Sequence, residues 1–151
     1  MKTKRLIIAI ALLGCSSALF AGNCVNDLFK AAAQLPDAEK ITLNPFVTGL
    51  IKPFVPEMKG INSMDIIDAE FITEKDYSRL EKMIFRCNGD GYETAISSNE
   101  ENELSRIFMK IEKEKIREVV IVSLDKDEIS LIRIKGNIDP KQVGELVKDK
   151  E

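Results

Sequence analysis

The second half of the chain changes from a helical to a two-residue hydrophobic period, and this change constrains the fold most. Ile107, Met109 and Ile111 alternate with charged side chains, and Val119–Leu124 is almost continuously apolar. Alternation is typical of a half-buried strand, and a short continuous apolar run is typical of a central strand. Short charged segments at 112–115 and 125–128 separate the runs. The pattern therefore predicts antiparallel strands joined as hairpins, over 92–98, 106–112, 119–124 and 129–138.

The first half of the chain predicts helices separated by short strands at 40–43 and about 64–71. Asn26-Asp27 suits the cap of one helix, and Thr73 to Asp76 resembles the capping box of another. Their apolar stripes are Leu28, Phe29, Ala32 and Leu35, and Tyr77, Leu80 and Ile84. A last helix, with Val143, Leu146 and Val147 on one face, is expected after Asp139-Pro140. We expect a single α+β domain: an antiparallel β-meander of about four C-terminal strands, with one or two N-terminal strands, packed against helices.

A further helix is expected from Asn44-Pro45, with Asn as N-cap and Pro at the first helical position. Its apolar face contains Phe46, Val47, Leu50, Ile51 and Phe54. A stripe at helical spacing usually enters the core, and this is the use expected here. The alternative is a groove for a partner.

Residues 1–21 have the organisation of a bacterial secretory signal. The basic start Met1–Arg5 precedes the apolar run Leu6–Leu13, which is too short to span a bilayer. Cleavage between Ala21 and Gly22 would leave 22–151 as the domain. Cleavage before Cys15, within Leu-Leu-Gly-Cys, would instead give a lipoprotein anchored through that cysteine. We therefore expect a periplasmic or secreted protein of a Gram-negative envelope, with any membrane attachment through this lipid.

Cys24 and Cys87 remain in the chain after either cleavage. An oxidising compartment would favour a disulfide between them, and no redox-type Cys-x-x-Cys spacing is present. The bridge would close a loop of about 64 residues and stabilise the fold by roughly 4 kcal/mol in the chain-entropy model. Two separate thiols are the alternative.

Composition excludes several classes of function. Histidine is absent, which removes Ser-His-Asp and Cys-His nucleophilic sites and every His-based zinc site. The net charge is −3, and loss of Lys2, Lys4 and Arg5 with the signal would make it −6. An acidic, mixed-sign surface does not suit nucleic acid. No cofactor or metal is expected.

Carboxylates are the remaining candidates for chemistry. Asp68 and Glu70 would share a strand face, as the paired acids of a glycosidase could, but a solvated strand edge explains them better. Asp125, Asp127 and Glu128 could ligate calcium, but a charged hairpin turn explains them as well. Asn88–Gly91 is interpreted as a turn, because its flanks lack the ligands of an EF-hand.

The order of the short elements resembles the DUF4252 family of small exported proteins, found mainly in Bacteroidota. The resemblance lies in Ile41–Pro45, Ile61–Met64, Gly91–Glu93, the strands at 107–112 and 116–122, and Ile129–Asp139, and it covers about 26–147. It implies a secreted or lipid-anchored envelope domain and supplies no catalytic residues. Its members' frequent proximity to extracytoplasmic sigma-factor genes implies a connection with envelope signalling.

Three functions are consistent with the sequence. The first is a non-enzymatic envelope domain that binds an unidentified envelope protein or joins a signalling complex. The second is a lipid-anchored carrier or chaperone with an apolar cavity. The third is a carboxylate-based hydrolase, which would need a close pair of buried acids in a cleft.

Overall fold

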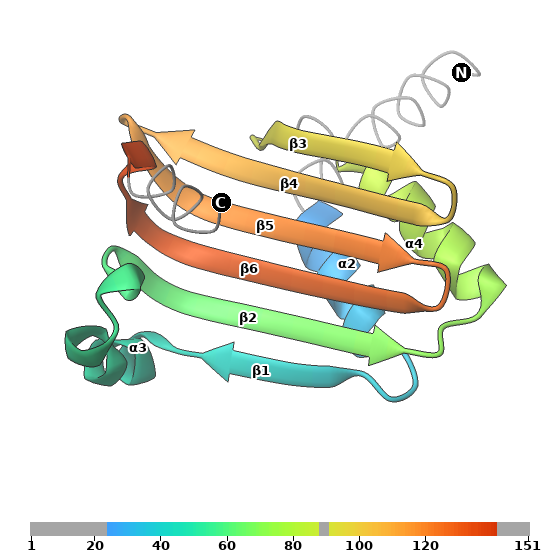
Figure 1. Cartoon of the computed structure of the whole chain (residues 1–151), viewed down its shortest axis with the longest axis horizontal. Coiled ribbons are helices and arrows are strands. Elements are labelled where there is room, and N and C mark those ends of the chain that lie inside the picture. The colour runs from blue at the N-terminus through green and yellow to red at the C-terminus, as the bar shows by residue number, and fades with distance from the viewer. Residues whose placement is uncertain (1–23, 88–90, 142–151) are drawn as a thin grey trace, which may run out of the picture.

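The computed structural model describes residues 24–87 and 91–141. They form a six-stranded antiparallel sheet in the order β1-β2-β6-β5-β4-β3, with α2 and α4 behind it in Figure 1. The strands are β1 Glu39–Leu43, β2 Ile61–Glu70, β3 Glu93–Glu100, β4 Glu103–Glu112, β5 Lys115–Asp125 and β6 Glu128–Ile138. The helices are α2 Cys24–Ala33, α3 Pro45–Ile51 and α4 Glu74–Arg86, and the 3-10 turns η1 Lys52–Phe54 and η2 Pro56–Met58 follow α3. The expected α+β class is confirmed.

Strands β3 to β6 form the predicted meander, in which each strand pairs with the next along the chain. Lys113 and Glu114 make the turn between β4 and β5 with φ of 50° and 65°. Two successive positive φ angles are typical of the tight turn whose twist matches a hairpin. β5 lies between β4 and β6, as its continuous apolar run predicted.

The N-terminal strands extend this sheet beyond β6. β2 pairs with β6 from Ile61 opposite Gly136 to Glu70 opposite Glu128, and β1 pairs with the outer side of β2. The chain enters β2 through Gly60, whose carbonyl oxygen accepts a hydrogen bond of 2.7 Å from Asn137 N–H. A Cβ atom at Gly136 would collide with that carbonyl oxygen. Glycine at 136 therefore permits the close approach of β2 to the end of β6.

Helices α2 and α4 bury one face of the sheet, which we call the covered face. The predicted stripe of α2 is buried, and Leu80 and Ile84 of α4 are 0% exposed. They meet Phe108, Val120 and Leu131, which are also 0% exposed. Thr73 is the N-cap of α4, as predicted, because its Oγ1 accepts a hydrogen bond of 3.1 Å from Asp76 N–H. The Asp76 carboxylate accepts a hydrogen bond of 3.2 Å from the Thr73 hydroxyl, so the reciprocal bond differs from that of a standard capping box.

Three expectations are corrected or remain open at the ends of these elements. α2 begins at Cys24, so Asn26 lies inside its first turn and is not its N-cap. β2 ends at Glu70, because Phe71 has a φ of 58° and leaves the strand. Residues 88–90 of the predicted turn, and Val143, Leu146 and Val147 of the expected last helix, lie outside the described residues.

Candidate functional site

A buried ion pair joins β5 and β6 beneath α2. Arg133 Nε lies 3.2 Å from Glu118 Oε1, and the two side chains are 10% and 11% exposed. This Nε atom makes no hydrogen bond, but Arg133 Nη2 donates one of 2.8 Å to Asn26 Oδ1. The guanidinium carbon also lies 4.4 Å from the centroid of the Phe29 ring. Arg133 therefore pairs with Glu118 inside the sheet and connects the sheet to α2 through a hydrogen bond and a cation–π contact.

Tyr92 completes this cluster from the segment that leads into β3. Its hydroxyl donates a hydrogen bond of 2.8 Å to Glu118 Oε1. Burial raises the pKa of the Tyr92 phenol, and the hydrogen bond to Glu118 and the carboxylate's charge raise it further. The phenol thus remains a donor, and Tyr92 and Arg133 both contact Glu118 Oε1.

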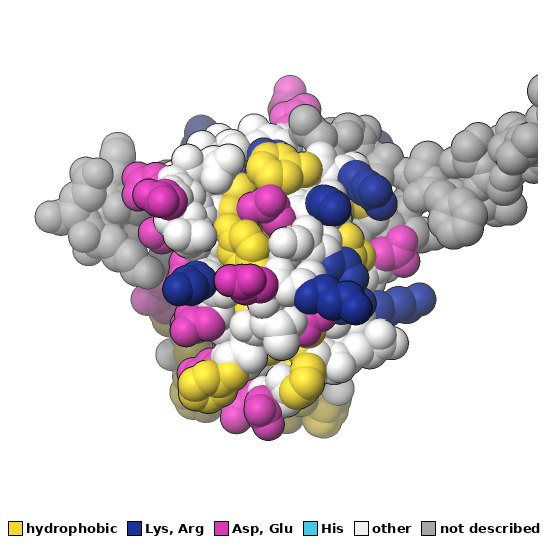
Figure 2. All heavy atoms as spheres, turned by 90° about the vertical axis from the view of Figure 1, so that its right-hand side faces the viewer, with side chains coloured by type: hydrophobic (Ala, Val, Ile, Leu, Met, Phe, Trp, Pro, Cys, Tyr) yellow, Lys and Arg dark blue, Asp and Glu magenta, His cyan; other side chains and the backbone are white. Residues whose placement is uncertain are grey.

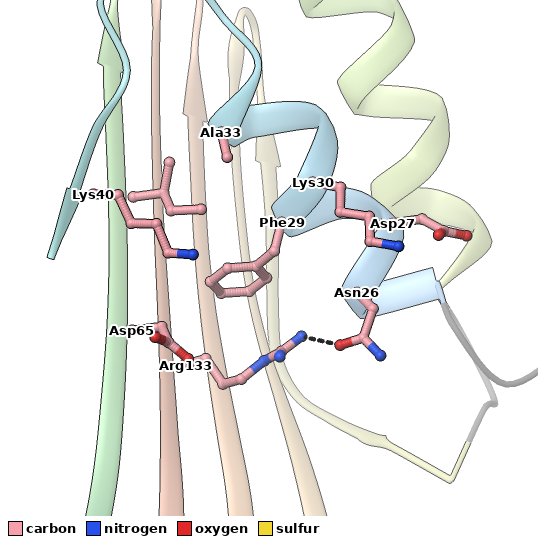
Figure 3. Close-up of a pocket in the computed structure, with 9 residues that line it drawn as sticks. Asn26, Asp27, Phe29, Lys30, Ala33, Lys40, Asp65 and Arg133 are labelled. Atoms are coloured by element: carbon pink, nitrogen blue, oxygen red, sulfur yellow. Dashed lines mark hydrogen bonds between the residues drawn. The ribbon is translucent and has the colours of Figure 1, made fainter. Parts of the chain in front are cut away.

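A pocket of about 380 Å³ lies beside the ion pair, between α2 and strands β1, β2 and β6 (Figure 3). It is lined by Asn26, Asp27, Phe29, Lys30, Ala33, Lys40, Asp65, Ile67 and Arg133. In Figure 3, Lys40 extends from β1 toward Phe29, above Asp65 and Arg133. Asp65 Oδ1 accepts a hydrogen bond of 2.9 Å from Thr42 Oγ1. Both signs of charge line the pocket, and Arg133 and Asp65 already have polar partners. Of these lining residues, Arg133 links the sheet to Asn26 and Phe29 of α2.

Asp68 and Glu70 share a strand face, as predicted, but β2 is an internal strand and not an edge. Both residues are exposed. With Asp37, Glu39 and Phe71 they line a depression of about 200 Å³. A glycosidase-type pair needs an enclosed cleft in which one acid stays protonated. The exposed pair therefore gives no support to the hydrolase hypothesis.

The acidic turn between β5 and β6 has a structural role. The Asp127 carbonyl oxygen accepts a hydrogen bond of 2.9 Å from Ile72 N–H, which ties the turn to the segment before α4. Within residues 24–87 and 91–141, no three His, Cys, Asp or Glu side chains are grouped so that they could hold a metal ion. The turn interpretation of Asp125, Asp127 and Glu128 thus accounts for their positions.

The apolar face of α3 contradicts its predicted place in the core. Phe46, Leu50 and Phe54 are 75%, 60% and 84% exposed. The buried residue of α3 is instead Thr48, at 1% exposure, whose hydroxyl lies 2.6 Å from the Asn62 carbonyl oxygen. The helix thus turns Thr48 toward the sheet and Phe46 and Leu50 toward solvent, while Val47 and Ile51 of the predicted apolar face are half-buried. We call Phe46, Leu50 and Phe54 the α3 surface.

The cysteine predictions concern both described and undescribed residues. Cys24 is the first residue of α2, and Cys87 is the C-cap of α4. Both belong to the packing of the core, and their helices contact each other. The disulfide between them remains a prediction. Cys15, Ala21 and Gly22 lie outside the described residues, so lipidation and signal cleavage remain predictions too.

The sequence profile of a family described as a domain of unknown function (DUF4252) matches residues 33–146. The chain belongs to the DUF4252 family. The resemblance drawn from the order of short elements is therefore confirmed. No curated protein and no solved structure gives a significant match to this member. Among the described residues of this DUF4252 protein, no helix is both long and apolar enough to cross a membrane.

Sequence reasoning missed the cluster of Arg133, Glu118 and Tyr92, although β5 and β6 contain a signal for it. Arg133 follows Ile129 and Leu131 at two-residue spacing, so it occupies a position on the same buried face. Glu118 interrupts the buried series of β5 in the same way. Opposite charges at buried positions of neighbouring strands predict an ion pair, once the strands are known to be adjacent.

Proposed function

We propose that this DUF4252 protein is a non-enzymatic, exported domain of the cell envelope that binds another protein through the α3 surface. The observation that carries the proposal is the exposure of Phe46, Leu50 and Phe54, by 75%, 60% and 84%, on one short segment. Aromatic side chains are the usual anchors of protein interfaces. A cluster of this kind on a water-exposed segment favours a partner that buries it.

The α3 surface is held in a fixed orientation by polar contacts on its other side. Thr48 Oγ1 lies 2.6 Å from the Asn62 carbonyl oxygen at the start of β2. Asn44 Oδ1 accepts a hydrogen bond of 2.9 Å from Val47 N–H and caps the helix. Because these contacts hold the helix on the sheet, little backbone conformational entropy is lost when the exposed side chains enter an interface.

The proposed export rests on the signal-like residues 1–21. Intact mass of the protein recovered from fractionated cells tests it. A mass that begins at Gly22 identifies a soluble periplasmic form, and one that begins at an acylated Cys15 identifies a membrane-anchored form. A cytoplasmic protein that retains Met1 would refute export.

Site-specific photo-crosslinking in living cells tests the binding surface. A photoreactive residue at Leu50 should yield one defined adduct with a different protein, whereas the same residue at Glu101, exposed in the β3–β4 turn, should not. Phe54→Asp should abolish the Leu50 adduct without changing the melting temperature, because Phe54 is 84% exposed. Equal labelling from Leu50 and Glu101 would refute the α3 surface as a binding site.

The carrier hypothesis finds less support in the described pockets. The pocket beneath α2 is lined by five charged side chains. The depressions near Asp68 and near Tyr77 are also lined mainly by charged and polar residues. An apolar cargo would have to desolvate these groups, which disfavours it.

A further inference from the structure

The face of the sheet opposite the covered face carries one isoleucine from every strand, all in register. Ile41 lies opposite Ile66, Ile66 opposite Ile132, Ile132 opposite Ile121, Ile121 opposite Ile107, and Ile107 opposite Ile96. A second apolar row lies beside the first and contains Leu43, Met64, Ile134, Val119 and Met109. We call these two rows the open face.

In Figure 1, α2 and α4 lie behind the sheet, and α3 lies beyond the end of β1, so none of the described helices covers the open face. At the edges of the sheet, Ile41 and Ile96 are 53% and 55% exposed. Toward the centre, Ile121 and Ile132 are half-buried, since each is flanked by apolar neighbours on both sides. A continuous apolar face of this kind is typical of an interaction surface.

The size of the face suits a protein interface. Six strands spaced by about 4.8 Å span about 29 Å, and two rows of side chains extend about 13 Å along the strands, so the apolar rows cover about 380 Å². A polar row follows the isoleucines and contains Glu39, Asp68, Ser130, Ser123, Ser105 and Ser98. With that row and the acidic row beyond it, the face measures about 780 Å², close to the roughly 800 Å² that each partner buries in a standard complex.

We infer that a second copy of this chain covers the open face, so that two sheets pack face to face in a symmetric dimer. A two-fold interface must be complementary to itself, and rows of apolar side chains without charges at their centre meet this requirement. An apolar centre with a polar rim is also the usual anatomy of a stable interface. This inference is independent of the α3 surface.

Charge determines how the two copies are oriented. Beyond the serines, one end of the sheet carries an acidic row on the same face: Glu70, Glu100, Glu103, Asp125 and Glu128. Figure 2 views this end with the open face toward the left, where acidic side chains predominate, while most basic side chains lie toward the right. Stacking two such ends would bring like charges together, so the two-fold axis runs across the strands, near Ile121 and Ile132.

Sedimentation of the purified full-length protein across a range of concentrations tests the dimer. The unchanged protein should sediment as a dimer that dissociates on dilution, and Ile121→Lys should be monomeric at every concentration. Phe85→Lys is the matched control: it adds the same charge at an exposed apolar position of α4, behind the sheet and outside both the open face and the α3 surface, and should leave the dimer intact. An unchanged protein that is monomeric at about 100 μM, far above the dissociation constant of a stable dimer, would overturn the inference.

A crosslink tests the geometry without disrupting the packing. Ile132→Cys, close to the two-fold axis, should form a covalent dimer under mild oxidation, and Glu101→Cys, in the exposed β3–β4 turn, should not. If Ile121→Lys fails to fold, this pair of variants decides the question, and equal crosslinking of both overturns the inference. A chain ending at Lys141 identifies the other occupant: if the unchanged protein is monomeric and only the shortened chain dimerises, residues 142–151 cover the open face and the dimer is refuted.

Discussion

The covered face and the open face of this sheet have similar apolar content, but they differ in what lies against them. On the covered face, Leu131 and Val120 are sealed by α2 and α4, and a buried ion pair is placed among them. On the open face, Ile132 and Ile121 occupy the next positions along the same strands and remain half-buried. Alternation in a strand thus identifies which residues share a face, but both faces of a central strand can be apolar.

The difference lies in how each face is stabilised. Intramolecular packing secures the covered face at any protein concentration, because both helices are part of the same chain. The open face has no described helix against it, so its burial depends on another occupant. Substitutions on the covered face should therefore alter the free energy of unfolding directly, and those on the open face should act mainly through association.

The largest effect is expected from breaking the ion pair of the covered face. Glu118→Ala removes the partner of a buried guanidinium and should lower the free energy of unfolding by about 3–5 kcal/mol. Urea denaturation measures it. Glu112→Ala is the matched control, since Glu112 lies 3.9 Å from Arg117 with a side chain that is 62% exposed. Glu112→Ala should lower the free energy of unfolding by less than about 1 kcal/mol.

Removing both charges of the ion pair distinguishes the effect of charge pairing from that of side-chain packing. The double variant Glu118→Ala with Arg133→Met leaves no buried charge unpaired and should recover part of the lost stability. If Glu118→Ala lowers the free energy of unfolding no more than Glu112→Ala does, the ion pair does not stabilise the covered face. The covered face and the open face would then differ less in how they are stabilised.

A smaller loss of stability is expected at two neighbouring residues of β6, one on each face of the sheet. Leu131→Ala creates a cavity at a position that is 0% exposed, and it should cost about 3 kcal/mol. Ile132→Ala removes a half-buried side chain and should cost about 1 kcal/mol in dilute solution. Chemical denaturation at two protein concentrations compares them. The cost of Ile132→Ala should grow with concentration if a second copy covers the open face, and that of Leu131→Ala should not.

Local patterns predicted much of this fold because local physics determines those parts. The meander follows from alternation and from charged turns such as Lys113-Glu114, and the start of α4 follows from the reach of the Thr73 hydroxyl to Asp76 N–H. The sequence also placed Leu80 and Ile84 in the core correctly. Each of these features depends on residues close together in the chain.

The failures arise where distant parts of the chain meet. The pairing of β2 with β6 joins Ile66 to Ile132, and no local pattern shows that these strands are neighbours. The apolar stripe of α3 was assigned to the core, but periodicity cannot show which side of a helix meets the sheet. Here Thr48 forms that contact, through the carbonyl oxygen of Asn62. Thr48 faces the sheet because its hydroxyl can form a hydrogen bond with a backbone carbonyl oxygen there.

The smallest effect on stability is expected at Tyr92, which lies beside the ion pair of the covered face. Tyr92→Phe removes the hydrogen bond to Glu118, and because Glu118 keeps Arg133 as a partner, the cost at pH 7 should be only about 1–2 kcal/mol. The variant should also alter the dependence of stability on alkaline pH. Burial, followed by the hydrogen bond and charge of Glu118, raises the pKa of Tyr92 above the ordinary tyrosine value of 10.0. The unfolded chain therefore loses this proton first as pH rises.

The folded state retains that proton, so the contribution of Tyr92 is complete below pH 10 and is lost as pH rises from there toward its folded pKa. Tyr77, whose pKa is raised by burial and by Glu81, adds to the same loss. Urea denaturation between pH 9 and pH 11 should show stability falling in the unchanged protein and falling less steeply in Tyr92→Phe. Identical slopes of stability against pH in the two proteins would mean that Glu118 does not hold the Tyr92 phenol. This part of the covered face would then be as open to solvent as the open face.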